Sequence, residues 1–471
     1  GRSLRRGIYL LLAITAIASA AGRIMAVRAT TGETPMLSAN DRSRWCTIAA
    51  LVDHGTYEID ALVARRHTQT QRRHWHSIDL VRHRGYDGRE HYYSSKPPLL
   101  PTLLAGQYWL IQKTLGLDIV KQPFYVMRLM LLLTNGFLLA LLFLLIANLV
   151  ESYGRTDWGR IGVFAVATWG TFLTTFAVTL NNHLPAAVSV LLAIWLASGI
   201  KQASQSSRWA FFGSGLAAGF AVANELPALA FLVLLAAWLY RLSAIKMLTG
   251  FVPGALLVAA AFFATNYLAH GTWKPAYAHR HDGQLLAEIN GDAVRVVESD
   301  DGRQLEIDYD KLNQGLADYS IVIDSKAIIA ATRIPNRWNL WDRKSQRRLA
   351  LVQNEGQVDI REWGNWYEYA GSYWNNPQGI DRGEKSRLAY LLNSLVGHHG
   401  IFSLSPVWLL AFWGAICSLR VRRHELWPLA CGALLLTVVC LGFYVARPLN
   451  DRNYGGISCG FRWLFWLIPI W

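Results

Sequence analysis

Four short polar segments lie at the ends of long apolar runs, and each contains residue types that can take part in chemistry. In the first segment, 40–45, Asp41 is followed by Arg42 and Arg44. A carboxylate that is held beside cations can act as a general base toward a hydroxyl. The alternative is a structural role, because an aspartate caps helix N-termini well and a helix is expected over Ser43–His54. Both interpretations stay open at this point.

The second segment, 92–99, contains Lys96 directly before Pro97 and Pro98. A lysine ammonium is a compact positive charge that suits a phosphate, and the rigid proline pair would fix its position at the start of the next helix. An ordinary lysine that extends from an apolar helix toward water gives the same pattern. The segment therefore predicts either a phosphate-binding group or a solvated lysine.

The third segment is a polar turn between two apolar runs and contains Asn181, Asn182 and His183. A similar turn further along the chain contains Glu225. Polar groups beside apolar runs cost free energy unless they find partners, so these residues are candidates for substrate contacts. Glu225 could bind a cation or a hydroxyl group. Alternatively, the residues of both turns only cap the helices that follow.

The fourth segment, 450–463, combines three glycines with Arg462, which opens the next apolar run. Glycines would allow the backbone to approach a ligand closely, and a guanidinium could hold a phosphate. Cys459 lies in this segment and Cys46 directly follows the first one. If both face an oxidising compartment they could form a disulfide, although free thiols are the simpler expectation.

The apolar runs predict an integral membrane protein. The chain of 471 residues is 52% hydrophobic and only 17% charged, and a helix needs about 20 apolar residues to cross the hydrocarbon of a bilayer. The net charge of +14 comes from basic residues in the loops, so membrane topology explains it without a nucleic-acid partner. Clear candidate spans are Ile8–Val27, Leu129–Val150, Leu184–Ile200, Ala244–Leu268 and Leu426–Ala446.

Charge determines the expected topology, because short cytoplasmic loops are enriched in Lys and Arg. The N-terminus is basic, and so are four short loops, at Arg155–Arg160, Lys201–Arg208, Arg241–Lys246 and Arg420–Arg423. These loops agree with one another only if one of the apolar segments 99–115 and 123–150 does not cross. We expect 99–115 to lie in the interface, since it is short and follows two prolines. The polar segments then share the non-cytoplasmic face.

The expected fold is an all-α polytopic membrane protein with about ten spans and a small, mostly β or α/β external insert. Residues 1–268 would form the catalytic membrane region, including an external loop at 28–122. Residues 269–399 would form the insert, in which Val294–Glu298 and Gln304–Tyr309 read as a β-hairpin. Residues 400–471 would be a C-terminal membrane region that is truncated, because the chain stops inside an apolar run.

Two of the motifs together resemble a known family. Asp41-Arg42-Ser43-Arg44-Trp45 is followed about fifty residues later by Tyr93-Ser94-Ser95-Lys96-Pro97-Pro98-Leu99. This pairing resembles the polyprenyl-phosphate-dependent glycosyltransferases of the GT-C superfamily, notably the protein O-mannosyltransferases and the lipid A aminoarabinose transferases. In that family an acidic residue opens the first external loop and a Lys-Pro-Pro-Leu-like or His-Pro-Pro-Leu-like stretch closes it. The likeness covers about 1–268 and, more loosely, Gly460–Trp463.

The resemblance implies transfer of a sugar from a polyprenyl-phosphate-linked donor to a protein, lipid or glycan hydroxyl on the non-cytoplasmic face, with inversion at the anomeric carbon. Asp41 would be the catalytic base and Lys96 would hold the donor phosphate. Arg44 and Arg462 would assist Lys96. The candidate substrate contacts are Tyr93, Asn182, His183 and Glu225.

Some features remain open. Relatives often have an acidic residue where this chain has 181–183, so a metal requirement is undecided and His183 could act as a hydrogen-bond donor instead. The implied partners are membrane lipids, the lipid-linked donor and the acceptor, and the implied location is a bacterial inner membrane with the site facing the periplasm. The alternative is a transporter or lipid flippase, which would place ionisable groups near the midplane of the membrane.

Overall fold

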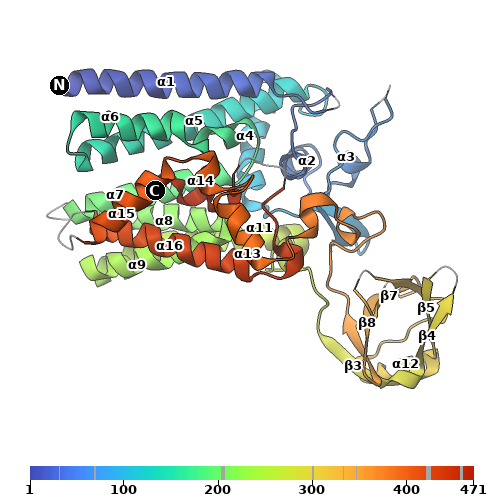
Figure 1. Ribbon diagram of the computed structural model, residues 1–471. Coiled ribbons are helices and arrows are strands. Elements are labelled where there is room, and N and C mark those ends of the chain that lie inside the picture. Colours follow the sequence, from blue (N-terminus) through green and yellow to red (C-terminus); the bar gives the residue numbers. More distant parts are fainter. Residues whose placement is uncertain are drawn as a thin grey trace. The chain divides into compact units, whose positions relative to one another are not determined.

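The computed structural model describes residues 1–30, 32–67, 70–202, 207–299, 302–332, 334–345, 347–420, 426–456 and 460–471. These residues are mostly helical, with a smaller β-rich part (Figure 1). The chain divides into two compact units. The first comprises Gly1–Asp79, Lys96–Trp273 and Gln378–Trp471, and the second comprises Leu80–Ser95 and Lys274–Pro377. The second unit therefore includes 80–95, which the sequence suggested was part of the first external loop.

The first unit is a bundle of apolar helices. Six of its described segments are long and apolar enough to cross a membrane, which confirms the expected membrane helices. They are Arg2–Ala26 (α1), Pro123–Tyr153 (α5), Asp157–Val178 (α6, η1 and η2), His183–Gln202 (α7), Ala244–His270 (α10, η4 and α11) and Trp427–Ala446 (α16). Shorter apolar segments are Leu226–Leu242 (η3 and α9) and Trp408–Leu419 (α15).

Shorter elements complete the first unit. Its other α-helices are α2 (Ala39–Asp53), α3 (Asp60–Ala64), α4 (Leu99–Leu115), α8 (Arg208–Asn224), α13 (Arg387–Leu395) and α14 (Ile401–Leu404). Its other 3₁₀ segments are η9 (Gly379–Arg382), η10 (Leu449–Asp451) and η11 (Arg462–Ile470). Local sequence explains several boundaries. Pro123 suits the start of α5 because its missing amide would be unpaired there anyway, and Gly271 ends α11 in the left-handed region, at φ 68°.

Glycines bring α8 and α11 into close contact. A Cβ added to Gly215 of α8 would lie 2.0 Å from the backbone oxygen of Phe251, and one added to Gly254 of α11 would lie 2.2 Å from that of Phe212. Neither distance is compatible with a side chain. Small residues spaced four apart allow two helices to approach to backbone contact in an apolar environment. Gly215 and Gly219 of α8 have this spacing, as do Gly250 of η4 and Gly254 of α11, which directly follows η4.

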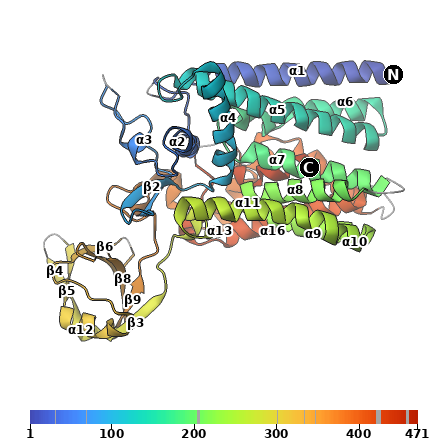
Figure 2. The same cartoon turned by 180° about the vertical axis from the view of Figure 1, so that it is seen from behind.

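The helix α4 does not run with the bundle. Figure 2 shows α4 lying across the ends of α1 and α5, with the N-terminus and α10 at the opposite end of the bundle. It packs instead on α2, where Asp53 accepts hydrogen bonds from Tyr108 (3.2 Å) and Gln112 (2.8 Å). This arrangement agrees with the expectation from loop charges that 99–115 does not cross.

The second unit is built on antiparallel strands. Five form one sheet in the order β3-β9-β8-β7-β6, and two hairpins, β1-β2 and β4-β5, pair separately. The strands are β1 (Leu80–Arg84), β2 (Glu90–Ser94), β3 (Leu285–Asn290), β4 (Val294–Ser299), β5 (Gly302–Ile307), β6 (Ile328–Ala331), β7 (Arg337–Asp342), β8 (Arg347–Asn354) and β9 (Gln357–Glu362). The β4-β5 pairing confirms the expected hairpin, and the unit confirms a small β-rich region.

Apolar side chains hold this sheet together. Its fully buried residues include Leu340, Leu351, Val358 and Ile360, which alternate along their strands as one covered face requires. Leu312 of the single α-helix, α12 (Tyr309–Gly315), belongs to the same core. Short 3₁₀ segments complete the unit: η5 (Ala276–Ala278), η6 (Gly291–Ala293), η7 (Ala317–Tyr319) and η8 (Tyr373–Asn375).

The position of α4 yields a topology test. Lys121, which follows α4, has a side chain that is 79% exposed. In cells carrying a Lys121→Cys variant without the native cysteines, we expect a membrane-impermeant maleimide added from outside to label this position. An exposed position in the loop after α5, Arg155→Cys, serves as the control and should be labelled only after the membrane is opened. Labelling of Lys121→Cys from the cytoplasm alone would reverse the topology.

Candidate functional site

Asp41 lies in the first turn of α2 and has both a structural contact and an unused oxygen. Ser38 caps the helix by accepting a hydrogen bond from the Asp41 amide (3.1 Å), and Oδ2 of Asp41 accepts the amides of Leu37 (3.1 Å) and Ser38 (3.4 Å). This reciprocal arrangement is a capping box. The helix thus begins at Ala39, earlier than expected, and Asp41 does stabilise its start. Its second oxygen, Oδ1, is buried and has no hydrogen-bond partner among the described residues.

The surroundings of Asp41 bring its proton affinity near neutrality. The residue is only 1% exposed. Burial raises the pKa of Asp41 to about 7, against the opposing effects of Arg42 and of the two backbone hydrogen bonds. A carboxyl with a pKa near the working pH can accept a proton and release it again. Asp41 therefore has the electrostatic properties of a general base as well as those of a helix cap.

A buried hydrogen-bonded network connects α2 with the turns that begin α7 and end α8. Arg44 donates through Nη2 to Oδ1 of Asn182 (2.7 Å), and Asn182 donates in turn to Oε1 of Glu225 (2.8 Å). His183 Nδ1 contacts the same carboxylate oxygen. Arg44, His183 and Glu225 are each at most 5% exposed. Asn182 and His183 thus contact Glu225 directly, and Arg44 is connected to it through Asn182.

The two polar turns are positioned by their own backbone. Asn181 Oδ1 accepts a hydrogen bond from the amide of His183 (2.9 Å) and so caps α7, which is the structural role that the sequence allowed for this turn. The side chains of Asn182 and His183 instead contact Glu225. Glu225 ends α8 in an extended conformation, at φ −136° and ψ 101°. Its carboxylate binds across to Asn182 and His183 and makes no capping hydrogen bond to η3, the helix that follows.

Lys96 forms an ion pair with Asp79, a residue that the sequence did not single out. Its Nζ lies 3.0 Å from Oδ1 of Asp79. Burial opposes the charge of both groups, but Lys96 and the nearby arginines outweigh it for Asp79, whose pKa stays below its usual value. For Lys96 burial dominates, so the pKa of its ammonium is also below its usual value, although Asp79 opposes this.

The charges of Arg44 and Arg462 act on both Asp79 and Lys96. Burial lowers the pKa of Arg44 to about 10, and this effect is opposed by Asp79 and Glu225. We refer to these residues together as the polar cluster: Asp41, Arg44, Asp79, Lys96, Asn182, His183, Glu225 and Arg462. All of them belong to the first unit.

The glycines before Arg462 serve the protein itself. Gly455 has φ 89°, and a Cβ on it would lie 2.3 Å from Nε of Arg462. The expectation that these glycines admit a ligand is thus corrected at Gly455, where the close approach is to the Arg462 side chain. That side chain also lies over the ring of Trp463, 4.9 Å from its centroid. Gly455 thus leaves room for the Arg462 side chain.

Tyr93 and Cys46, two further residues singled out in the sequence, are not part of the polar cluster. Tyr93 belongs to the second unit, where it is buried and its ring stacks on His83 at 4.2 Å. A role in substrate binding stays a prediction for this residue. Cys46 is buried and its thiol lies 3.4 Å from the carbonyl oxygen of Trp75. Cys459 lies outside the described residues, so the pairing of the two cysteines also stays a prediction.

An apolar cavity lies apart from these residues. It has a volume of about 310 Å³ and is lined by side chains from α5, α7, α9 and α16, among them Leu149, Trp238 and Trp427. None of the cluster residues lines it. Its walls suit an acyl or prenyl chain better than a reacting polar group. The polar cluster, and not this cavity, therefore holds the groups that could react.

Substituting the glycines tests how Arg462 is positioned. Gly455 and Gly456 have similar φ values, 89° and 85°, but a Cβ at Gly456 has no neighbour within 4 Å. Both Gly455→Ala and Gly456→Ala should lose about 1–3 kcal/mol of unfolding free energy through backbone strain. We expect Gly455→Ala to lose more, because the new methyl also displaces Arg462. Thermal unfolding in detergent measures the difference, and equal losses would contradict this role of Gly455.

The cluster combines a carboxyl that titrates near neutrality with three cations at a helix-end site. Such a set can remove a proton from a hydroxyl and stabilise a departing anion. Comparison of the chain with models of known protein families, with curated proteins and with solved structures finds no match. The chemistry of these residues is thus the basis for assigning a function.

Proposed function

We propose that this chain is a membrane glycosyltransferase that transfers a sugar from a polyprenyl-phosphate-linked donor to a hydroxyl of a protein, lipid or glycan. The observation that carries the proposal is a set of buried polar atoms without partners. Oδ1 of Asp41 lacks a hydrogen bond, as do Nε of Arg44 and Nε of Arg462, within the described residues. Buried polar groups without a partner indicate a place for a ligand. The Asp41 oxygen would suit a hydroxyl group, and the two arginine nitrogens would suit an anion.

The proposed reaction uses the two kinds of group in one step. Asp41 accepts the proton of the acceptor hydroxyl while that oxygen forms a bond to the anomeric carbon of the sugar. The bond from the anomeric carbon to the phosphate oxygen breaks, and the polyprenyl phosphate leaves with the electron pair. Lys96, Arg44 and Arg462 stabilise its charge. Direct displacement inverts the configuration at the anomeric carbon.

Asp79 has a definite place in this scheme. It occupies the ammonium of Lys96 before the donor arrives, so a phosphate must compete with a carboxylate for that charge. A buried lysine without a partner tends to lose its proton, and an ion pair with a carboxylate opposes this loss. Asp79 would therefore keep Lys96 charged and ready for the donor.

The remaining residues of the cluster would orient the acceptor and sugar. Glu225, Asn182 and His183 form a hydrogen-bonded group beside Arg44. The proposed topology has about ten spans, in which shorter apolar segments cross the membrane in addition to the six long ones. The site would then lie on the periplasmic face of a bacterial inner membrane. The GT-C superfamily remains the proposed relationship.

Removing the charge of Asp41 tests the proposed base. With a labelled polyprenyl-phosphate sugar, Asp41→Asn should lower the transfer rate by about 10²–10⁴-fold, the usual contribution of a general base. Asp53→Asn is the matched control, because Asp53 is a carboxylate at the other end of the same helix and contacts Tyr108. A folded Asp41→Asn protein that transfers sugar at the wild-type rate would refute the mechanism. Lipid movement without any transfer would favour the flippase alternative.

The pH dependence of the rate tests the same residue independently. A general base works in its ionised form, so kcat/KM should rise about tenfold per pH unit below pH 7 and level off above it, because the pKa of Asp41 is about 7. An inflection near pH 4, where an ordinary aspartate titrates, would mean that another group is the base. The measurement needs initial rates across this range, with circular dichroism to show that the protein stays folded.

A further inference from the structure

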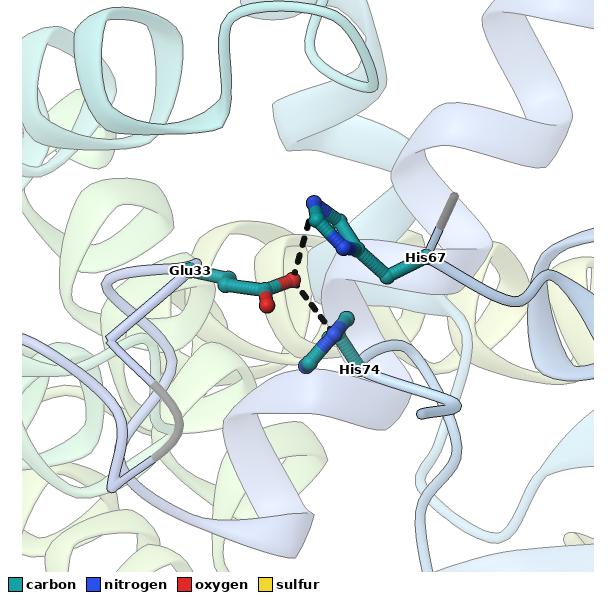
Figure 3. A group of neighbouring side chains, drawn as sticks. All are labelled: Glu33, His67 and His74. Atoms are coloured by element: carbon teal, nitrogen blue, oxygen red, sulfur yellow. Dashed lines mark ion pairs between the residues drawn. The ribbon is translucent and has the colours of Figure 1, made fainter. Parts of the chain in front are cut away.

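Three residues from the irregular segments before α2 and after α3 converge outside the polar cluster. Glu33, His67 and His74 each direct one ligand atom toward the others, and these atoms all lie within 4.8 Å of one another. Figure 3 shows the two imidazole rings approaching the Glu33 carboxylate from different sides. His67 Nε2 lies 3.3 Å from Glu33 Oε2, and His74 Nε2 contacts the same oxygen.

Direct hydrogen bonding does not explain this convergence. Oε2 of Glu33 is buried, yet no hydrogen bond of acceptable geometry reaches it from the described residues, even though two ring nitrogens are close. The two ring nitrogens thus lie beside this oxygen without a hydrogen bond of acceptable geometry. A cation held between the two rings and the carboxylate could be bound by all three groups.

We propose that Glu33, His67 and His74 bind a divalent transition-metal ion, of which Zn²⁺ fits best. Two imidazoles and one carboxylate are a recurrent zinc donor set that leaves the fourth position to water. Nitrogen donors disfavour Mg²⁺ and Ca²⁺, which prefer oxygen ligands. Zinc bonds of about 2.0–2.1 Å place tetrahedral ligands about 3.3 Å apart, which is the separation found between His67 and Glu33. His74 lies closer to Glu33 than this, so zinc binding would require these two ligands to move apart.

The neighbouring groups are compatible with this ion. Thr70 contacts both Glu33 (3.3 Å) and His74 (3.2 Å) through its hydroxyl, so it can orient these two ligands or share the open position. A metal on Nε2 requires the ring proton of His67 on Nδ1, so the hydrogen bond that Nδ1 accepts from the Thr70 amide (3.3 Å) would be lost on binding.

The ion would join two parts of the loop and support α2. Glu33 lies six residues before α2, whereas His74 lies next to residues that contact this helix. Arg42 donates to the carbonyl of His76 (2.8 Å), and the Cys46 thiol lies beside the carbonyl of Trp75. Closing the loop with a metal would therefore hold the segment that packs on the helix bearing Asp41. The ion has a structural role here and is not part of sugar transfer.

Zinc binding to the full chain in detergent tests the proposal. The protein is purified through a tag without histidines, stripped with a chelator, and titrated with Zn²⁺ against a competing indicator. We expect one tight equivalent for the wild type. Glu33→Gln and His74→Gln should weaken it by more than about 10–100-fold, the loss that changing a group behind a metal ligand already causes. His76→Gln, a change at a neighbouring histidine in the same loop, should leave it unchanged.

Thermal unfolding gives a second readout that does not require equal stability of the variants. Zn²⁺ should raise the unfolding temperature of the wild type and of His76→Gln, because it binds the folded chain, but not that of His74→Gln. Equal binding of Zn²⁺ by the wild type and His74→Gln would overturn the proposal. So would an equal rise in unfolding temperature with Mg²⁺. Neither outcome depends on an assay of sugar transfer.

Discussion

A single buried carboxylate, that of Glu225, joins elements that are far apart in the sequence. It accepts a hydrogen bond from Asn182 and contacts His183 at the start of α7, while Asn182 also accepts a hydrogen bond from Arg44 of α2. Removing one partner from a buried charged pair costs about 3–5 kcal/mol, because the other charge is left without compensation. The start of α7 and the end of α8 are therefore held together with α2.

The three carboxylates around this connection differ in their surroundings rather than in their chemistry. Asp79 is neutralised by Lys96, whereas Asp41 is buried with only backbone donors and more distant arginines. An ammonium in contact favours ionisation and burial alone opposes it, which separates the proton affinities of two otherwise identical side chains. Separation of this kind is how enzymes assign different roles to the same residue type. Here it makes Asp41 the group able to exchange protons near neutrality.

The sequence predicted what depends on local pattern. Apolar runs predicted the long helices, loop charges predicted that 99–115 does not cross, and the strand pattern predicted the β4-β5 hairpin. Contacts between distant residues were not accessible in this way. Asp79 is separated from Lys96 by a hairpin that belongs to the other unit, and Glu33 is 34 residues from His67 without a regular ligand spacing. Likewise, the partner of Gly455 could only be identified once the backbone had brought it to Arg462.

The glycine contact between α8 and α11 has a mechanical consequence. Because the carbonyl of Phe251 occupies the place that a side chain would take at Gly215, no larger residue is accommodated at this position. Rotation of either helix about its axis would replace the glycine at the contact by a residue with a side chain, so the contact favours one relative orientation of the two helices. Glu225 directly follows α8 and therefore lies at the end of a helix whose orientation is restricted in this way.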